Sequence, residues 1–499
     1  MSTIRKQSII SSVVVYIGFA LGFFNTYLFT REGGFTKEEY GLTGLFIAFA
    51  NIMYSVANLG MITYIHKFFP YYKDRLPKEK NDMLTIALLL STTGFLLVTI
   101  AGLVFKDVLI DKIFANSPGI IHYYYWIFLF GFGLTVFSIF EAYSWQHEKA
   151  VLTNFSKEVL FRLLITLLIV LSTLGFIKKF DVFIKFYSFL YIFIALFIAA
   201  YLLVTHRLHF SLSISNLSRK LFKKIITLVS FVWGGQLIYT LANVFDTIVI
   251  AAVLPNGLAV AAIFTLAQNI SSLIQAPQRG IISSSIGPLS QAWKNKDYEK
   301  INRIYHRSSI NQLIFSTAMF SLIWLNFEDG IKTFNLQESY NEAKWVFFFL
   351  GITKIIDMGT GVNSQIIGTS TYWKFEFISG LVLLSLALPL NYILTRQMGV
   401  IGPAISNLIA FSIYNAIRYW FLLKRFNMQP FNLNTVYTLL LAVGCYYASF
   451  YIFNHQQGFL WIVLRSLLFV ALFAAGVIKL KLTPDLKPVL NTFRKRLKL

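Results

Sequence analysis

Apolar residues occur along the chain in runs of about 20, and short polar stretches separate these runs. A run of this length crosses a hydrocarbon layer of about 30 Å as an α-helix. We count about fourteen runs, and none has the alternating pattern of a membrane barrel strand. The pattern therefore predicts an all-α polytopic membrane protein. The predicted spans are, to within a few residues, 9–29, 41–61, 83–104, 120–140, 159–177, 183–205, 226–253, 258–282, 308–327, 343–367, 374–394, 400–422, 434–453 and 459–480.

Positive charges gather in every second connection between these spans. The Lys and Arg residues concentrate near 67–80, 207–224, 294–307 and 487–498, whereas the alternate connections hold few apart from Lys178 and Lys179. Cytoplasmic loops are rich in Lys and Arg, so we expect both termini in the cytoplasm. The net charge of +22 then reflects topology and attraction to anionic membrane lipids, and requires no nucleic acid as a partner.

Composition narrows the function classes further. Hydrophobic residues make up 56% and charged residues 13%, whereas a soluble protein carries about a quarter charged residues. Cys445 is the single cysteine and lies in a predicted span, which excludes a disulfide framework and a cysteine metal cluster. No G-x-x-x-x-G-K-[ST] motif occurs, which excludes an ATP-driven pump in this chain. The seven histidines are scattered, so we expect no metal site and no cofactor, with coupling to H⁺ or Na⁺ left open.

The chain divides after six spans, at a polar, basic and serine-rich connection. At an offset of 218 residues, a few positions of the second part repeat those of the first, for example Phe46 with Phe264 and Pro70 with Pro288. Transporters are commonly built from such repeats. We therefore expect two pseudo-symmetric six-helix lobes at 1–205 and 225–425, a cytoplasmic linker at 206–224, and two extra helices with a basic tail at 426–499.

Ionisable residues at membrane depth are costly and are therefore candidates for function. Lys354 and Asp357 lie three residues apart on one face of a predicted span, where they either neutralise each other or line a polar cavity. Asp246 has no nearby cation in the sequence, so it either pairs across the bundle or faces a water-filled cavity.

Further polar candidates lie in other spans. Arg279 follows Pro277 in the inner part of its span, and it either lines the cavity or snorkels to the interface. Asn25 and Asn51 line the opposing wall or bridge helices. Three arginines near span ends are expected to snorkel, namely Arg162, Arg418 and Arg465.

Several sequence segments resemble a known family in their order and spacing. These are Ala276-Pro-Gln-Arg-Gly, Gly287-Pro-Leu-Ser, Gly361-Val-Asn-Ser-Gln-Ile-Ile-Gly-Thr-Ser and Gly399-Val-Ile-Gly-Pro-Ala-Ile-Ser-Asn, with Glu39-Tyr-Gly-Leu near the start. Over nearly its whole length the chain resembles the polysaccharide-transport flippases of the Wzx type. Their superfamily also holds the MATE drug exporters and the lipid II flippase MurJ. The resemblance implies two lobes around a cavity with lateral access for a lipid-linked sugar, and Arg279 best matches a cavity cation of that kind.

The leading hypothesis is a flippase of the bacterial cytoplasmic membrane. It would move undecaprenyl-pyrophosphate-linked oligosaccharides for O-antigen, capsule or exopolysaccharide assembly, and the polysaccharide polymerase machinery is a candidate partner. The first alternative is a cation-coupled exporter of amphipathic molecules, with Asp246 and Asp357 as its proton or sodium site. The second is a membrane enzyme that acts on lipid-linked glycans. The short outward loops, near 106–119 and 328–342, argue against the enzyme.

Overall fold

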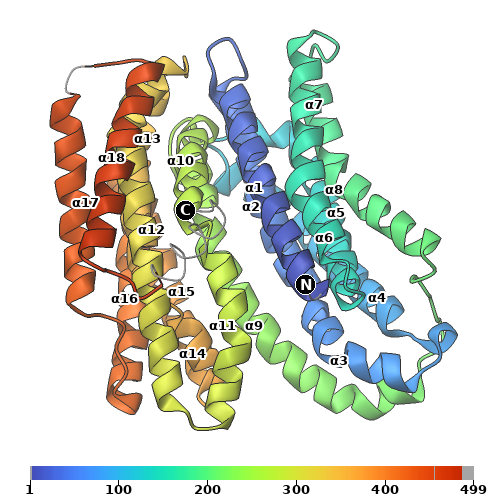
Figure 1. Cartoon of the computed structure of the whole chain (residues 1–499). Helices are drawn as coiled ribbons and strands as arrows, with labels where there is room; N and C mark the ends of the chain where they lie inside the picture. The colour runs from blue at the N-terminus through green and yellow to red at the C-terminus, as the bar shows by residue number, and fades with distance from the viewer. Residues whose placement is uncertain (1–2, 454–455, 486–499) are drawn as a thin grey trace. The chain divides into compact units, whose positions relative to one another are not determined.

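A computed structural model describes residues 3–453 and 456–485, and every regular element in this part of the chain is a helix (Figure 1). Two compact units divide the chain, Met1–Thr265 and Leu266–Leu499, and their boundary falls inside helix α10. This boundary follows from packing and lies beyond the connection at 206–224. The proposed pair of six-helix lobes concerns internal repetition and stays a prediction. The basic tail at 487–498 lies outside the described residues.

The first unit contains nine complete α-helices and the first half of α10. They are α1 (Thr3–Thr30), α2 (Lys37–Ala57), α3 (Met61–Arg75), α4 (Met83–Val104), α5 (Ile120–Gln146), α6 (Ala150–Asn154), α7 (Phe161–Thr173), α8 (Phe180–Val204), α9 (Asn216–Val253) and α10 (Gly257–Ser272). A π-helical turn, η3 (Phe155–Leu160), joins α6 to α7.

The second unit begins within α10 and continues through a 3₁₀ turn, η4 (Leu273–Gln275). Its helices are α11 (Gln278–Lys294), α12 (Tyr298–Thr333), α13 (Ala343–Gly359), α14 (Asn363–Thr369), α15 (Trp373–Met398), α16 (Ile401–Phe426), α17 (Leu433–Ile452) and α18 (Phe459–Lys479). A second 3₁₀ turn, η5 (Glu338–Glu342), precedes α13.

Polar residues fix where several helices begin. The Thr36 hydroxyl accepts from the Glu39 amide at 3.2 Å, and the Glu39 carboxylate accepts from the Thr36 amide at 2.8 Å. This capping box satisfies two amide groups that the first turn of α2 would otherwise leave without partners. At α12, Asp297 accepts from the Lys300 amide at 2.9 Å. The segment Glu39-Tyr-Gly-Leu, which resembles the flippases, therefore also has a local role as a helix start.

The core of the first unit is built from aromatic rings and one close backbone contact. The rings of Phe130 and Tyr187 stack between α5 and α8 with centroids 5.0 Å apart, and Phe46 of α2 packs on Phe130. A Cβ at Gly41 would lie 1.8 Å from the Leu258 carbonyl oxygen. Only glycine permits this approach, so α2 and α10 pack backbone against backbone.

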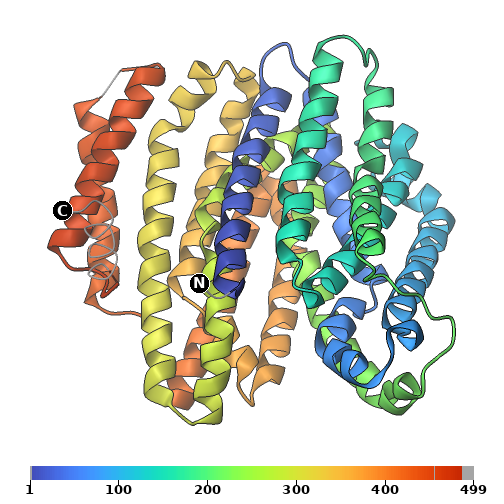
Figure 2. The same ribbon diagram turned by 45° about the vertical axis from the view of Figure 1, so that its right-hand side comes forward.

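In the second unit, the long helix α12 packs against both α17 and α18 (Figure 2). Phe469 and Phe473 of α18, Cys445 of α17 and Leu325 of α12 are buried in one cluster. The two C-terminal helices are therefore packed onto their unit through a shared apolar core.

The predicted count of fourteen spans is not confirmed. Within the described residues, ten helices are long and apolar enough to cross a membrane, or eleven if the bent pair Glu338–Gly359 and Asn363–Thr369 is one span. The predicted spans at 9–29, 159–177 and 400–422 lie on helices outside this set. Polar residues explain the last case, because α16 carries buried Ser, Asn and Arg side chains that lower its hydropathy.

Two apolar helices are each followed, after a break, by a more polar helix that contains a proline. A left-handed Gly60 separates α2 from α3, and Pro70 lies inside α3. The 3₁₀ turn η4 separates α10 from α11, and Pro288 lies inside α11. These segments are the ones that the offset of 218 residues aligns. The internal repeat and the six-plus-six division both stay predictions.

Candidate functional site

A network of side-chain amides surrounds Asp357 in the second unit. Its carboxylate accepts from Nε2 of Gln278 at 3.0 Å, from Nε2 of Gln275 at 3.5 Å and from Nδ2 of Asn415 at 3.2 Å. These donors come from α11, η4 and α16, whereas Asp357 lies on α13. One carboxylate therefore ties three elements to α13.

The network continues through Asn415, which is buried. Its side-chain oxygen accepts from the Thr360 hydroxyl at 3.0 Å and from Nδ2 of Asn363 at 3.1 Å. Thr360 ends α13 and Asn363 begins α14, so these bonds hold the bend between the two helices. Buried amides satisfied in this way specify one arrangement of their helices, because each lost partner is costly at low dielectric.

The predicted cations lie on two of the elements that the network joins. Arg279 directly follows Gln278 at the start of α11, where Pro277 is the N-cap, and its side chain is exposed. Lys354 lies one turn before Asp357 on α13 and is half-buried. The hydrogen bond between Gln278 and Asp357 therefore holds the first turn of α11, on which Arg279 lies, against α13.

The expectation that Arg418 snorkels is wrong. Its side chain is 5% exposed, pairs with the Glu376 carboxylate and donates to the Tyr414 hydroxyl, and its guanidinium carbon lies 3.6 Å from the Tyr414 ring centroid. Ser364 donates to the same Glu376 at 2.7 Å. The carboxylate compensates the buried charge, so Arg418 need not reach the interface. This ion pair lies one turn from Asn415 and joins α14, α15 and α16.

Arg465 is also buried, contrary to the expectation of snorkelling. It pairs with Asp329 at 3.5 Å and donates to the carbonyl oxygens of Leu325 at 3.2 Å and Gln456 at 2.8 Å. Arg465 and Asp329 are both less than a tenth exposed. The pair links α18 to α12 and closes the apolar cluster between them at one end.

The first unit holds a charged cluster that the sequence analysis missed. Lys157 pairs with Glu141 at 3.5 Å, and Arg162 pairs with Glu158 at 2.9 Å. We predicted spans at 120–140 and 159–177, which placed three of these residues in a loop. The structure instead extends α5 to Gln146 and resumes helix at Ala150. The Arg162 side chain is 25% exposed, so it is paired rather than extended freely to the interface.

Glycines of α1 make room for this cluster. A Cβ at Gly18 would lie 2.6 Å from the Glu158 carbonyl oxygen, and one at Gly22 would lie 3.3 Å from Nε of Arg162. The Gly18-x-x-x-Gly22 motif therefore packs α1 against the charged turn η3 and the start of α7. Small residues at such an interface allow helices in a membrane to approach closely.

The remaining predicted site residues of the first unit are Asn25, Asn51 and Asp246. Asn25 donates to the Arg162 carbonyl oxygen at 2.8 Å and accepts from the Thr166 hydroxyl at 2.6 Å, which fits the alternative of a bridge between α1 and α7. Asn51 donates to the Ile47 carbonyl oxygen of its own helix at 2.7 Å. Asp246 is 1% exposed within α9. A cavity role for these three residues stays a prediction.

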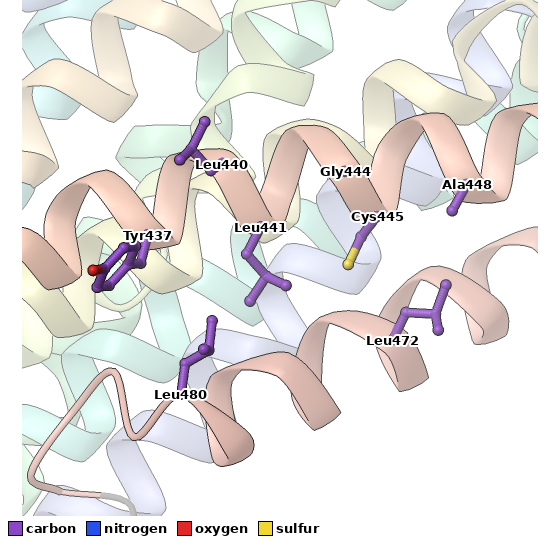
Figure 3. A pocket seen from close by; sticks show the side chains of 8 residues that line it. All are labelled: Tyr437, Leu440, Leu441, Gly444, Cys445, Ala448, Leu472 and Leu480. Carbon is purple, nitrogen blue, oxygen red and sulfur yellow. The ribbon is translucent and has the colours of Figure 1, made fainter.

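An apolar groove of about 510 Å³ lies between α17 and α18 (Figure 3). Its lining consists of Tyr437, Leu440, Leu441, Gly444, Cys445, Ala448, Leu472 and Leu480. The groove is suited to a hydrocarbon chain. The described residues contain no group of three or more His, Cys, Asp or Glu side chains arranged to hold a metal ion.

The sequence pattern of a family described as polysaccharide biosynthesis protein matches residues 4–293. No curated protein matches the chain by sequence. Among solved structures, the lipid II flippase MurJ in an inward closed conformation is similar, with a TM-score of 0.70 and 16% identity over 95% of this chain and 99% of that one. An inward-facing MATE multidrug transporter gives a TM-score of 0.61 and 17% identity, and it covers 83% of this chain and 94% of the transporter. At such identities the likeness shows a shared fold.

Proposed function

The chain belongs to the family of polysaccharide biosynthesis proteins, and from this we propose that it flips undecaprenyl-pyrophosphate-linked oligosaccharides across the bacterial cytoplasmic membrane. The product would feed O-antigen, capsule or exopolysaccharide assembly, with the polymerase as the next partner. The fold supports a transporter, because MurJ and MATE proteins share it. MurJ is a flippase of lipid II, and that this chain also carries a lipid-linked substrate is part of the proposal.

The physical task requires a polar path beside an apolar one. A pyrophosphate and several sugars lose their hydration in hydrocarbon, at a cost that only charged and hydrogen-bonding groups of the protein can offset. We assign Arg279 and Lys354 to the pyrophosphate, because a guanidinium offers several donors in a planar fork and an ammonium adds a second positive charge. The prenyl chain stays in lipid.

The amide network around Asp357 is the observation that carries this assignment. It fixes Gln278 at 3.0 Å, and Arg279 is the next residue. A cation on a fixed turn binds phosphate with less loss of side-chain freedom than one on a mobile loop. Alternating access between two lobes would then carry the bound headgroup from one side of the membrane to the other.

The alternative is a cation-coupled exporter of amphipathic small molecules, with Asp246 and Asp357 as the coupling site. The shared fold of MATE transporters supports it. One observation and one expectation favour the flippase instead. The MurJ match covers 95% of this chain but the MATE match covers 83%, and α17 and α18 are the two helices that we expect drug exporters of this superfamily to lack.

Complementation in cells tests the proposal. The chain should restore surface glycan to a bacterium that lacks its own oligosaccharide flippase and makes a matching repeat unit, and lipid-linked oligosaccharide should no longer accumulate inside. Export of amphipathic cations, measured as drug resistance in a pump-deficient strain, should remain at the level of the empty vector. Restored resistance without restored glycan would instead establish the exporter.

A further inference from the structure

A pocket of about 480 Å³, lined mainly by polar and charged residue types, lies at the N-terminal end of α12, apart from the residues assigned to transport. Its lining combines side chains of the first three turns of α12 with one residue of the segment after α18. The lining residues are Glu299, Asn302, Arg303, His306, Arg307 and Pro484.

The position of this pocket along α12 is that of a lipid headgroup. The helix has 36 residues, which corresponds to about 54 Å at about 1.5 Å per residue and exceeds the hydrocarbon thickness of about 30 Å. The charged residues Glu299, Lys300, Arg303 and Arg307 crowd its first ten positions, and an apolar stretch follows. The pocket therefore opens where the polar end of α12 meets the membrane interface.

The wall of the pocket is held in place by the segment that follows α18. The Arg307 guanidinium pairs with Asp485 through two nitrogens, with Nε 3.2 Å from Oδ2. Asn311 donates to the same carboxylate at 2.7 Å and accepts from the Thr483 hydroxyl at 2.6 Å. These contacts fix Pro484 and Arg307, so the pocket is built before any ligand arrives.

Two opposite charges on α12 are left for a ligand. Glu299 and Arg303 are both exposed and lie four residues apart on one helix face, and the described part of the chain records no ion pair for either side chain. Residues at this spacing have Cβ atoms about 5–6 Å apart. His306 adds an imidazole whose Nδ1 donates to the Asn302 carbonyl oxygen at 3.0 Å, which leaves Nε2 for the ligand.

We propose that this pocket binds the headgroup of phosphatidylethanolamine. Arg303 would hold the phosphate, and the ammonium group two carbons away would donate to Glu299 and to the imidazole of His306. Within the pocket, Glu299 balances Arg303 and Asp485 balances Arg307, so the lining itself carries no net charge and suits a zwitterion better than an anion. An ammonium with N–H donors is also preferred over the quaternary group of phosphatidylcholine, which cannot donate a hydrogen bond. This proposal is independent of the transported substrate.

Native mass spectrometry of the delipidated full chain tests the proposal. Phosphatidylethanolamine, phosphatidylcholine and phosphatidylglycerol with identical acyl chains are titrated in parallel, and phosphoethanolamine and inorganic phosphate serve as water-soluble probes. We expect the ethanolamine lipid to bind about tenfold more tightly than the choline lipid, as one hydrogen bond between charged groups allows. The soluble probes should bind weakly, since they lack acyl chains.

Two variants and a matched control locate the site. Glu299→Gln should remove the preference for ethanolamine over choline, and Arg303→Gln should weaken both lipids. Lys300→Gln removes a neighbouring exposed charge that does not line the pocket, and it should leave the preference unchanged. The proposal would be overturned if the wild type bound phosphatidylethanolamine and phosphatidylcholine equally, or bound phosphatidylglycerol more tightly than phosphatidylethanolamine. It would also be overturned if phosphoethanolamine bound as tightly as phosphatidylethanolamine, or if Glu299→Gln kept the preference for ethanolamine over choline.

Discussion

Replacing Asp357 by leucine tests whether the amide network positions Arg279. The change removes the acceptor of Gln278 at 3.0 Å and of Asn415 at 3.2 Å, whereas the contact with Gln275 at 3.5 Å is at the limit of a hydrogen bond. A hydrogen bond to a charged group contributes about 1.5–3 kcal/mol. Two such bonds would give about 3–6 kcal/mol, but Asp357 is half-buried and water can replace part of each. We therefore expect a loss of about 2 kcal/mol.

This loss should appear in transport as well as in stability. A cost of about 2 kcal/mol on the arrangement that binds substrate lowers its population roughly 30-fold. Asp357→Asn should cost less, about 1 kcal/mol, because it keeps one acceptor oxygen and the Gln278 amide can rotate to accept from the new NH₂ group. The expected order of transport rates is therefore wild type, then Asn, then Leu.

The assay is the transport rate per molecule in reconstituted vesicles, together with the midpoint of thermal unfolding. Asp297→Asn is the matched control, because Asp297 caps α12 outside the network and asparagine caps a helix as well as aspartate does. A leucine variant that transports and unfolds like the wild type would refute the positioning role. A double change of Lys354 and Asp357 to apolar residues that keeps full transport would remove both from the site.

Three further predictions concern stability and topology. Arg418→Met should destabilise the protein by about 3–5 kcal/mol, because it leaves the Glu376 carboxylate without its cation. Adding Glu376→Leu should recover most of this loss. Equal stability of the single and double variants would contradict the ion pair. Burial, with Arg207 nearby, lowers the pKa of His147 from 6.5 to about 4, so its neutral form stabilises the fold above pH 6.5 and this stabilisation is lost as the pH falls toward 4. His147→Phe should therefore show a smaller decline in unfolding temperature over that range, and a decline equal to that of the wild type would refute the assignment. A cysteine at Ser213 in a cysteine-free background should resist an impermeant thiol reagent in intact cells, and ready labelling would reverse the predicted orientation.

The apolar runs predicted the helices well because a bilayer demands about 20 apolar residues for each crossing. All fourteen predicted ranges coincide mainly with helix in the described part of the chain. The ends were harder to place, as α5 shows. The predicted span ended at 140, before the polar residues of 141–149, yet α5 continues to Gln146 and its Glu141 pairs with Lys157 of the turn η3.

The site could be predicted only in part, because partners distant in the sequence decide what a polar side chain does. The spacing of Lys354 and Asp357 placed them on one face, but nothing in the sequence indicated that Asn415, 58 residues later, binds the same carboxylate. Arg418 was misjudged for the same reason, since Glu376 lies 42 residues away. When an arginine within a predicted span has no Asp or Glu nearby in its own helix, an acidic partner should be sought in the other helices.

Flipping of a defined lipid in vesicles tests the central claim most directly. Purified protein is reconstituted with a prenyl-pyrophosphate oligosaccharide that carries a fluorescent sugar, and a membrane-impermeant quencher reports how much of it reaches the outer leaflet. The wild type should equilibrate the two leaflets, Arg279→Lys should retain only part of the rate, and Arg279→Ala should fall to the level of empty vesicles. If alanine at position 279 supports the wild-type rate, Arg279 does not bind the pyrophosphate, and if the wild type itself moves no labelled lipid, the chain is not an oligosaccharide flippase.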